Sequence, residues 1–361
     1  MNLIIKAFLF FAVFLSTKIS AQVAPFVDFS GYLNTFYKGN IRTLELQRVN
    51  SFSAGDNILV YIDNRENFKV FNGEKTEQIT VQQVKFQHSD NIVAWQIGSF
   101  LYGYENGNKK TLCANTGDFI VKDSFIVFQD TRFKTINVWY KNEIIHLMQQ
   151  TGDMTMPEAI GENIIGFKDN GDVYRIFWRG KFYEIGGNAY QMEMNAGTDV
   201  ISFNNTVTKN FTVFEKGEFY DVENAFMKKY KSGRGFVIYE DQIGNLWKFQ
   251  NGDKFNVSDF NSGLWEVVDD SFIWNENNLL FTLENNVKTQ IINYMPSDYK
   301  LKNGMFSYRN NLGGVSIFYK GKNTLLTNQS ESNYTIYGNN VLVELFNKSF
   351  LYYSDGEIIH N

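Results

Sequence analysis

The chain has 361 residues, of which 43% are hydrophobic and 17% aromatic, so it is long and apolar enough to bury a large core. Its formal net charge of −5 argues against binding to nucleic acid or to anionic membrane surfaces, because both require basic patches. Cys113 is the single cysteine, which excludes an internal disulfide and leaves packing as the source of stability.

The first element along the chain is a secretory signal peptide, predicted for residues 1–21. Lys6 precedes an apolar run over residues 7–15, and the segment closes on Ser20 and Ala21. The run is shorter than the roughly 20 apolar residues that a membrane span needs. We therefore expect cleavage after Ala21, which removes Lys6 and Lys18 and changes the net charge from −5 to about −7. The mature domain is expected over residues 22–361, without a domain boundary.

From residue 22 onward the chain repeats one pattern of short apolar runs and polar turns. A hairpin turn recurs at steps of 34 to 38 residues, and each turn carries Gly or Asn, the residue types that tolerate positive φ. The turns fall at Gly39, Gly73, Gly107, Asn142, Gly180, Gly217, Gly252, Asn286, Gly321 and Gly356. This regularity predicts about ten structural units.

A column of aromatic residues follows the same period. We place one aromatic on the first strand of each unit, packed between neighbouring units, with Glu344 at this position in the tenth unit. The alternative is a sugar-stacking ladder along a central channel. The column comprises Phe29, Tyr61, Trp95, Phe128, Phe167, Phe203, Tyr239, Trp274 and Tyr308.

Each unit holds about four short β runs, as in "ILVYI", "FKVF", "EQIT" and "VKFQ" of the second unit. A four-stranded unit that recurs many times is typical of a propeller blade. We predict an all-β fold: a single closed β-propeller of roughly eight to ten short blades, with repeats of about 35 residues. Strand exchange between the two termini is expected to close the ring. Two tandem rings and an open β-solenoid are the alternatives.

The residues that could carry chemistry are few and scattered. His88, His146 and His360 lie in different repeats without a shared spacing, which predicts neither a metal site nor a catalytic triad. The "DNGD" stretch from Asp169 to Asp172 suits a tight turn better than a calcium loop. We therefore expect a non-enzymatic protein without a cofactor or metal.

Two methionine pairs occupy equivalent positions in neighbouring units. Met154 and Met156 lie 38 residues before Met192 and Met194, and each pair places two thioethers on one face of a strand. This arrangement suits either packing between blades or a Cu(I) site, since soft sulfur ligands favour Cu(I).

The repeats do not match the WD, kelch or YWTD patterns of known propellers. The signal segment ending in "SAQ" and the body rich in Asn, Lys and Phe resemble envelope proteins of gliding bacteria that use type IX secretion. Secreted cargo of that system carries a C-terminal sorting domain, whereas here the repeats continue to Asn361. This departure from the cargo pattern implies retention in the periplasm. An exported propeller of this kind is similar to the plug subunit that closes the periplasmic end of the type IX translocon.

The favoured function is a non-catalytic periplasmic interaction protein that docks one propeller face on an outer-membrane barrel or secretion complex, without inserting into the membrane. The expected contacts are loops between the first two strands of each unit, which share one rim. They include Arg65, Arg132, Asp169, Asn205, Asp241, Asn277 and Asn310. The alternative is a carbohydrate-binding or carbohydrate-active propeller, for which a channel-facing cluster of carboxylates and aromatics would argue.

Overall fold

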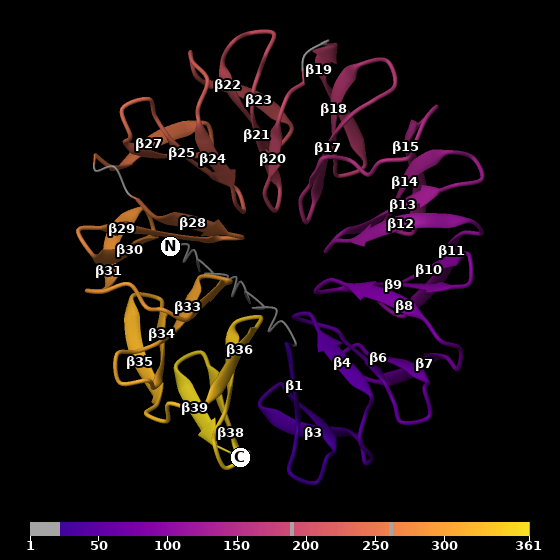
Figure 1. The fold of residues 1–361 in the computed structure, drawn as a ribbon, viewed down its shortest axis with the longest axis vertical. Helices are drawn as coiled ribbons and strands as arrows, with labels where there is room; N and C mark the ends of the chain where they lie inside the picture. The colour runs from indigo at the N-terminus through magenta and orange to yellow at the C-terminus, as the bar shows by residue number, and fades with distance from the viewer. Residues whose placement is uncertain (1–21, 188–190, 260–262, 361) are drawn as a thin grey trace, which may run out of the picture.

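The structure is a computed structural model that describes residues 22–187, 191–259 and 263–360. These residues form ten antiparallel sheets arranged as the blades of a closed ring (Figure 1). The predicted signal peptide, residues 1–21, lies outside the described residues. Within the part of the chain that is described, no helix is long and apolar enough to cross a membrane.

The strands follow one another in the same order in sequence and in each sheet. Blades one to three contain β1 (Val23–Val27), β2 (Leu33–Tyr37), β3 (Asn40–Glu45); β4 (Ser51–Ala54), β5 (Leu59–Ile62), β6 (Phe68–Phe71), β7 (Thr76–Thr80); β8 (Lys85–His88), β9 (Ile92–Ile97), β10 (Phe100–Glu105) and β11 (Asn108–Cys113). Blades four to six contain β12 (Thr116–Val121), β13 (Phe125–Asp130), β14 (Thr135–Tyr140), β15 (Glu143–Gln149); β16 (Ala159–Ile160), β17 (Ile164–Lys168), β18 (Val173–Trp178), β19 (Lys181–Gly187); β20 (Met194–Ala196), β21 (Val200–Asn204), β22 (Phe211–Glu215) and β23 (Glu218–Glu223).

The remaining blades repeat this order. Blades seven and eight contain β24 (Lys229–Ser232), β25 (Val237–Glu240), β26 (Leu246–Gln250), β27 (Asp253–Ser258); β28 (Trp265–Val268), β29 (Ser271–Glu276), β30 (Leu279–Glu284) and β31 (Val287–Ile292). Blades nine and ten contain β32 (Tyr299–Lys302), β33 (Met305–Arg309), β34 (Val315–Tyr319), β35 (Lys322–Thr327); β36 (Asn333–Tyr337), β37 (Asn340–Glu344), β38 (Phe350–Ser354) and β39 (Glu357–His360).

The first strand of a four-stranded blade lies nearest the ring axis and the fourth lies at the outer edge (Figure 1). We call the turn between the first and second strands the inner turn, that between the second and third the middle turn, and that between the third and fourth the outer hairpin. Because neighbouring strands are antiparallel, inner turns and outer hairpins lie at one end of each sheet. Middle turns and blade-to-blade connections lie at the other end, on the surface that we call the middle-turn face.

The predicted period is confirmed by the backbone of the outer hairpins. All ten predicted Gly and Asn positions have positive φ, from 63° at Asn286 to 95° at Gly356. In nine of the ten hairpins the preceding residue also has positive φ, for example Asn285 at 51°. Two consecutive residues of this kind form a type I′ turn, whose twist matches that of the flanking strands. The turn chemistry thus fixes the position of each outer hairpin.

Eight residues of the aromatic column are buried as predicted, but each lies on the second strand of its blade and not on the first. Phe29 was predicted wrongly, since its side chain is exposed in the turn between β1 and β2. This turn is a middle turn, because the three-stranded first blade lacks the innermost strand and β1 and β2 correspond to β5 and β6. In blade one the column position belongs to Phe26. Phe26 pairs with Asn34 across β1 and β2, just as Tyr61 pairs with Lys69 across β5 and β6. In the tenth blade the equivalent residue is the buried Val343 and not Glu344.

The core consists of separate apolar clusters, each shared by two neighbouring blades. The third and fourth blades illustrate the fit. A Cβ atom on Gly103 would lie 2.7 Å from the ring of Trp139, so glycine leaves the space that the buried indole fills. The predicted packing of side chains between blades is therefore the main source of cohesion, because burial of one such ring contributes a few kcal/mol.

The ring closes by packing between the first and last blades. Phe26 lies 4.4 Å from Phe350 and Phe36 stacks at 4.4 Å on Tyr352, measured between ring centroids. The predicted strand exchange is wrong for the described residues, since no sheet contains strands from both ends. The phasing of the repeats explains the error. The run "VKFQ", assigned to the second unit, contributes β8 to the next sheet, and the last blade has all four strands.

Candidate functional site

The seven residues predicted to mediate contacts share one face, but they lie in or beside the middle turns, between the second and third strands, and not between the first two strands as predicted. They fall into two groups that differ in what their side chains do. One group holds its own turn together by hydrogen bonds, and the other points to solvent.

Asp169, Asp241, Asn205 and Asn310 belong to the first group. Asp241 Oδ1 accepts the backbone N–H groups of Ile243 and Asn245 at 3.0 and 2.9 Å. Burial raises the pKa of Asp241, but hydrogen bonds from Trp247 and Asn245 outweigh it, so the pKa lies below its ordinary value.

Asp169 and Asn310 accept two backbone N–H groups in the same way, and the buried Asn205 accepts those of residues 207 and 208. These side chains form Asx turns. The "DNGD" stretch is accordingly a turn, as predicted.

Arg65, Arg132 and Asn277 belong to the second group, whose side chains are exposed. The guanidinium carbon of Arg132 lies 5.2 Å from the ring centre of Phe133. These three residues are available for contacts, and their role in binding stays a prediction.

Apolar side chains at the tips of the middle turns were missed from the sequence. Six of the ten turns present a large apolar side chain, with exposed fractions from 57% at Val207 to 92% at Phe29. The six residues are Phe29, Phe133, Val207, Ile243, Leu312 and Phe346. In three of them the signal was an apolar residue two positions after the Asx-turn residue, as in Asp241-Gln242-Ile243. Turn tips usually carry polar residues, so an apolar residue at this position distinguishes these turns from ordinary solvated ones.

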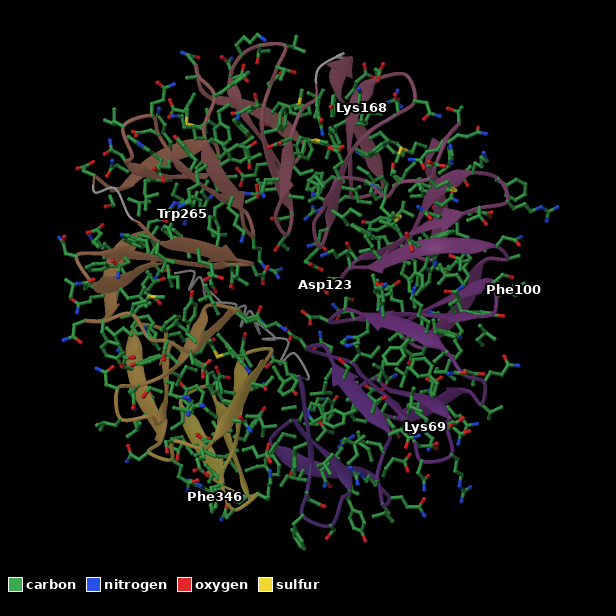
Figure 2. The ribbon with its side chains drawn as sticks, viewed as in Figure 1. Lys69, Phe100, Asp123, Lys168, Trp265 and Phe346 are labelled. Carbon is green, nitrogen blue, oxygen red and sulfur yellow. The ribbon has the colours of Figure 1, made fainter. Side chains whose placement is uncertain are left out.

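The apolar tips make the two faces of the ring different. Of the nine large apolar side chains that are more than half exposed in the described residues, eight lie on the middle-turn face, where Leu46 and Val81 in the blade-to-blade connections join the six tips. The ninth, Val287, follows an outer hairpin. Figure 2 shows Phe346 away from the axis and Asp123 close to it. The middle-turn face is therefore the apolar face.

A second candidate site is a cavity of about 580 Å³ on the axis, lined by the inner turns and inner strands of seven blades. Its lining carries both signs of charge, including Lys122, Asp123, Glu162, Arg234 and Asp269. Lys122 pairs with Glu162 at 2.7 Å, and Arg234 pairs with Asp269 at 2.8 Å. Much of the charge on this lining is therefore neutralised within the chain.

The carboxylates of successive inner turns are linked in series. The N–H of Asp56 donates to Asp90 Oδ1 at 2.9 Å, and the N–H of Asp90 donates to Asp123 Oδ1 at 3.0 Å. The N–H of Asp123 in turn donates to Glu162 Oε2 at 3.3 Å. Burial, followed by the negative charge of Asp90, raises the pKa of Asp123 to about 6. At each of these turns an acidic residue stands directly before "N-I" or "S-F", and this recurrence is the signal from which the series could have been predicted.

Asp56 links this series to the blades on either side of the closure. Its carboxylate accepts Lys302 Nζ at 2.6 Å, Asn303 Nδ2 at 2.9 Å and the Gly338 N–H at 2.8 Å. Burial lowers the pKa of Lys302, but the carboxylates of Asp56 and Asp90 outweigh it, so the pKa lies above its ordinary value. Asp56 thus joins the second blade to blades nine and ten beside the axis.

The lining of the axial cavity contains no Phe, Tyr or Trp side chain among the described residues. His88 lies there, and its ring nitrogens bond to Ser53 Oγ at 2.7 Å and to the Ser89 carbonyl at 3.0 Å. No group of three or more His, Cys, Asp or Glu side chains suited to a metal occurs in the described part of the chain. The buried Cys113 has a pKa raised by burial. A sugar-stacking ladder is therefore not built here.

The two methionine pairs pack in different clusters. Met154 and Met156 lie against the cluster between blades four and five, whereas Met192 and Met194 belong to that between blades five and six. This separation fits the packing alternative.

Residues 17–359 match the family described as the 10-bladed beta propeller domain. The chain belongs to this family. Ten sheets in the described residues agree with that blade number. No curated protein matches the chain.

Solved structures resemble this propeller only distantly. The computationally designed Ika8 protein is 13% identical, with a TM-score of 0.31, and the match covers 72% of this chain and 90% of that chain. Hsv2p of Kluyveromyces lactis is 11% identical, with a TM-score of 0.29 and coverage of 65% and 92%. A eukaryotic initiation factor is 8% identical, with a TM-score of 0.45 and coverage of 84% and 96%. These likenesses carry no argument about function.

Proposed function

We propose that this propeller is a non-catalytic interaction protein that docks its middle-turn face on a partner protein. The observation that carries the proposal is the concentration of exposed apolar side chains at the tips of that face. Single exposed apolar residues are ordinary on protein surfaces, whereas a group confined to one face marks an interaction site.

The energetics support binding of a large partner. Burial of one Phe, Leu or Ile side chain contributes about 1.5–3 kcal/mol. Several tips buried together therefore offset the cost of association, which is on the order of 4–15 kcal/mol. The Asx turns hold the tip backbones in place before binding, so less conformational entropy is lost.

The partner proposed from the sequence is an outer-membrane barrel or secretion complex that the chain meets in the periplasm after export. The most specific form of this proposal is a plug at the periplasmic end of the type IX translocon. It rests on the predicted signal peptide over residues 1–21 and on the compositional resemblance to envelope proteins of gliding bacteria. A channel-bound carbohydrate has less support, because the axial cavity lacks Phe, Tyr and Trp side chains in the described lining.

The test is affinity purification of the tagged chain from native envelope in mild detergent, followed by mass spectrometry. The variant pair Ile243→Asp and Leu312→Asp places charges at two tips of the middle-turn face. Val287→Asp is the matched control, because Val287 is 64% exposed but follows an outer hairpin.

We expect the wild type and the control to recover a large outer-membrane barrel in stoichiometric amount, and the double variant to lose it. Recovery of the chain alone, or equal recovery by the double variant, would refute docking by this face. Recovery of an envelope complex other than a translocon would refute the type IX form and leave the interaction role standing.

A further inference from the structure

The outer hairpins of blades three, four and five gather positive charge on the face opposite the middle turns. Residues 106–110, 141–145 and 179–183, which begin at the three turns, contain five Lys or Arg residues and one acidic residue, Glu143. This local charge is opposite in sign to the net charge of the chain, −5. We call this surface the cationic patch, and its charged members are Lys109, Lys110, Lys141, Arg179 and Lys181.

The three hairpins form one continuous surface at the outer edge of the ring (Figure 1). Lys110 Nζ of blade three donates to the carbonyl of Asn142 at 2.6 Å, in the hairpin of blade four. A Cβ atom on Gly180, in the hairpin of blade five, would lie 3.4 Å from the ring of Tyr140 in blade four. The cations of neighbouring blades therefore act together on whatever approaches this edge.

The cationic patch keeps most of its charge, because few of its members have a carboxylate partner. In the described residues, Lys109 alone has one, Glu77 at 3.5 Å. The hairpin cations of blades six to eight are each paired with a carboxylate, as Lys254 is with Glu223 at 2.9 Å. All five members except the half-buried Lys110 are exposed. An anion can therefore reach charges that nothing in the described part of the chain neutralises.

Aromatic and apolar side chains accompany these cations. The guanidinium carbon of Arg179 lies 4.6 Å from the ring centre of Trp178. Ile144 and Phe182, each three residues after the first turn residue, are both 43% exposed. Cations alone suit any anionic partner, whereas cations beside exposed apolar side chains suit the boundary between lipid headgroups and acyl chains. The composition therefore favours a phosphate-bearing lipid surface.

The acidic inner turns share this face of the ring but do not cancel the patch. Four strands spaced about 4.8 Å apart separate an inner turn from its outer hairpin by about 14 Å. Charges are screened over a Debye length of about 8 Å at physiological ionic strength. The carboxylates of Asp90 and Asp123 therefore act weakly at the hairpins, and the patch meets its partner with its own local charge.

We propose that the cationic patch binds the phosphate headgroups of an anionic lipid surface, with Ile144 and Phe182 at the level where the acyl chains begin. The contact is peripheral and uses the outer edge of three blades. It lies on the face opposite the apolar tips, so it is independent of the proposed protein partner, and both faces can be occupied together.

The test is flotation of the purified chain, without any protein partner, with large unilamellar vesicles. One set contains phosphatidylcholine alone and the other includes about 30% phosphatidylglycerol. We expect binding to the anionic vesicles only, at about 50 mM NaCl, and its loss at about 300 mM NaCl, because salt screens the attraction.

The variant pair Lys141→Asn and Arg179→Asn removes two cations without disturbing the turns, since φ is 48° and 50° and Asn is favoured there. It should weaken binding about 25-fold, because each cation near an anionic surface contributes about fivefold. The matched control is Lys134→Asn with Lys209→Asn, which removes two exposed cations at φ 52° and 65° from middle turns. The control should bind like the wild type.

A wild type that binds neutral and anionic vesicles equally, or neither, overturns the proposal. Binding that the patch variant leaves unchanged, or that the control weakens equally, does so as well. Binding to soluble poly-glutamate but not to vesicles overturns the lipid assignment in favour of an acidic peptide. None of these results bears on docking by the middle-turn face, which the affinity purification tests separately.

Discussion

Replacing Asp123 by Asn should stabilise the ring at neutral pH. The carboxyl group of Asp123 is half-buried beside Asp90, Glu162 and Asp56, and its pKa is raised to about 6. Moving a carboxyl pKa from 3.8 to about 6 corresponds to about 3 kcal/mol, since one pKa unit is worth about 1.4 kcal/mol. Asn keeps an oxygen that can accept the Asp90 N–H and removes the charge. We expect a gain of about 2–3 kcal/mol in the free energy of unfolding.

The stability advantage of Asp123→Asn should depend on pH. Between about pH 4 and pH 6 the folded chain binds more protons at Asp123 than the unfolded chain does, so the free energy of unfolding falls as pH rises. The penalty is absent below about pH 4 and complete above about pH 7. The advantage of Asp123→Asn should therefore be near zero at low pH and grow to its full value at neutral pH.

The assay is urea denaturation of the wild type and Asp123→Asn between about pH 4 and pH 8. Asp118→Asn is the control, because it makes the same change of charge at an exposed position of strand β12. The control should differ from the wild type by less than about 0.5 kcal/mol at every pH. A variant that is less stable than the wild type at pH 7, or an advantage that does not change with pH, would refute the reasoning.

Three further predictions concern the closure, the hairpins and the methionines. Asp56→Ala removes the acceptor of three hydrogen bonds beside the closure and should cost about 3 kcal/mol in urea denaturation, whereas Asp56→Asn should cost less. In thermal melts, Gly39→Ala should lower the free energy of unfolding by about 1–2 kcal/mol. The loss comes from backbone strain alone, since φ is 75° and no atom lies within 4 Å of the new Cβ. Asn142→Gly in the equivalent hairpin should cause no such loss. Competition titration with a chromogenic chelator should give the same Cu(I) affinity for the wild type and for Met192→Leu with Met194→Leu, and a weaker affinity in the variant would contradict the packing role.

The candidate sites could be predicted only in part. The sequence placed Arg65, Arg132 and their counterparts in turns on one face, because turn position follows from strand alternation. It could not show that the side chains of Asp241 and Asn310 accept hydrogen bonds from the backbone of their own turns, since that depends on the path of the backbone. The inner-turn carboxylates escaped prediction because residues some 34 positions apart meet only when blades stack around an axis.

The all-β class and the repeat length could be read from the sequence alone. Those features arise from local rules: Gly or Asn at positive φ sets each outer hairpin, and alternating apolar residues set each strand. Only the tertiary structure decided the phase of the blades, which moved the run "VKFQ" into the next sheet, and the residue at the column position in blade one, which is Phe26 and not Phe29. It also decided how the ring closes, through Asp56 and the packing of Phe26 on Phe350. These features depend on contacts between residues far apart in the chain, and a local pattern carries no information about which of them form.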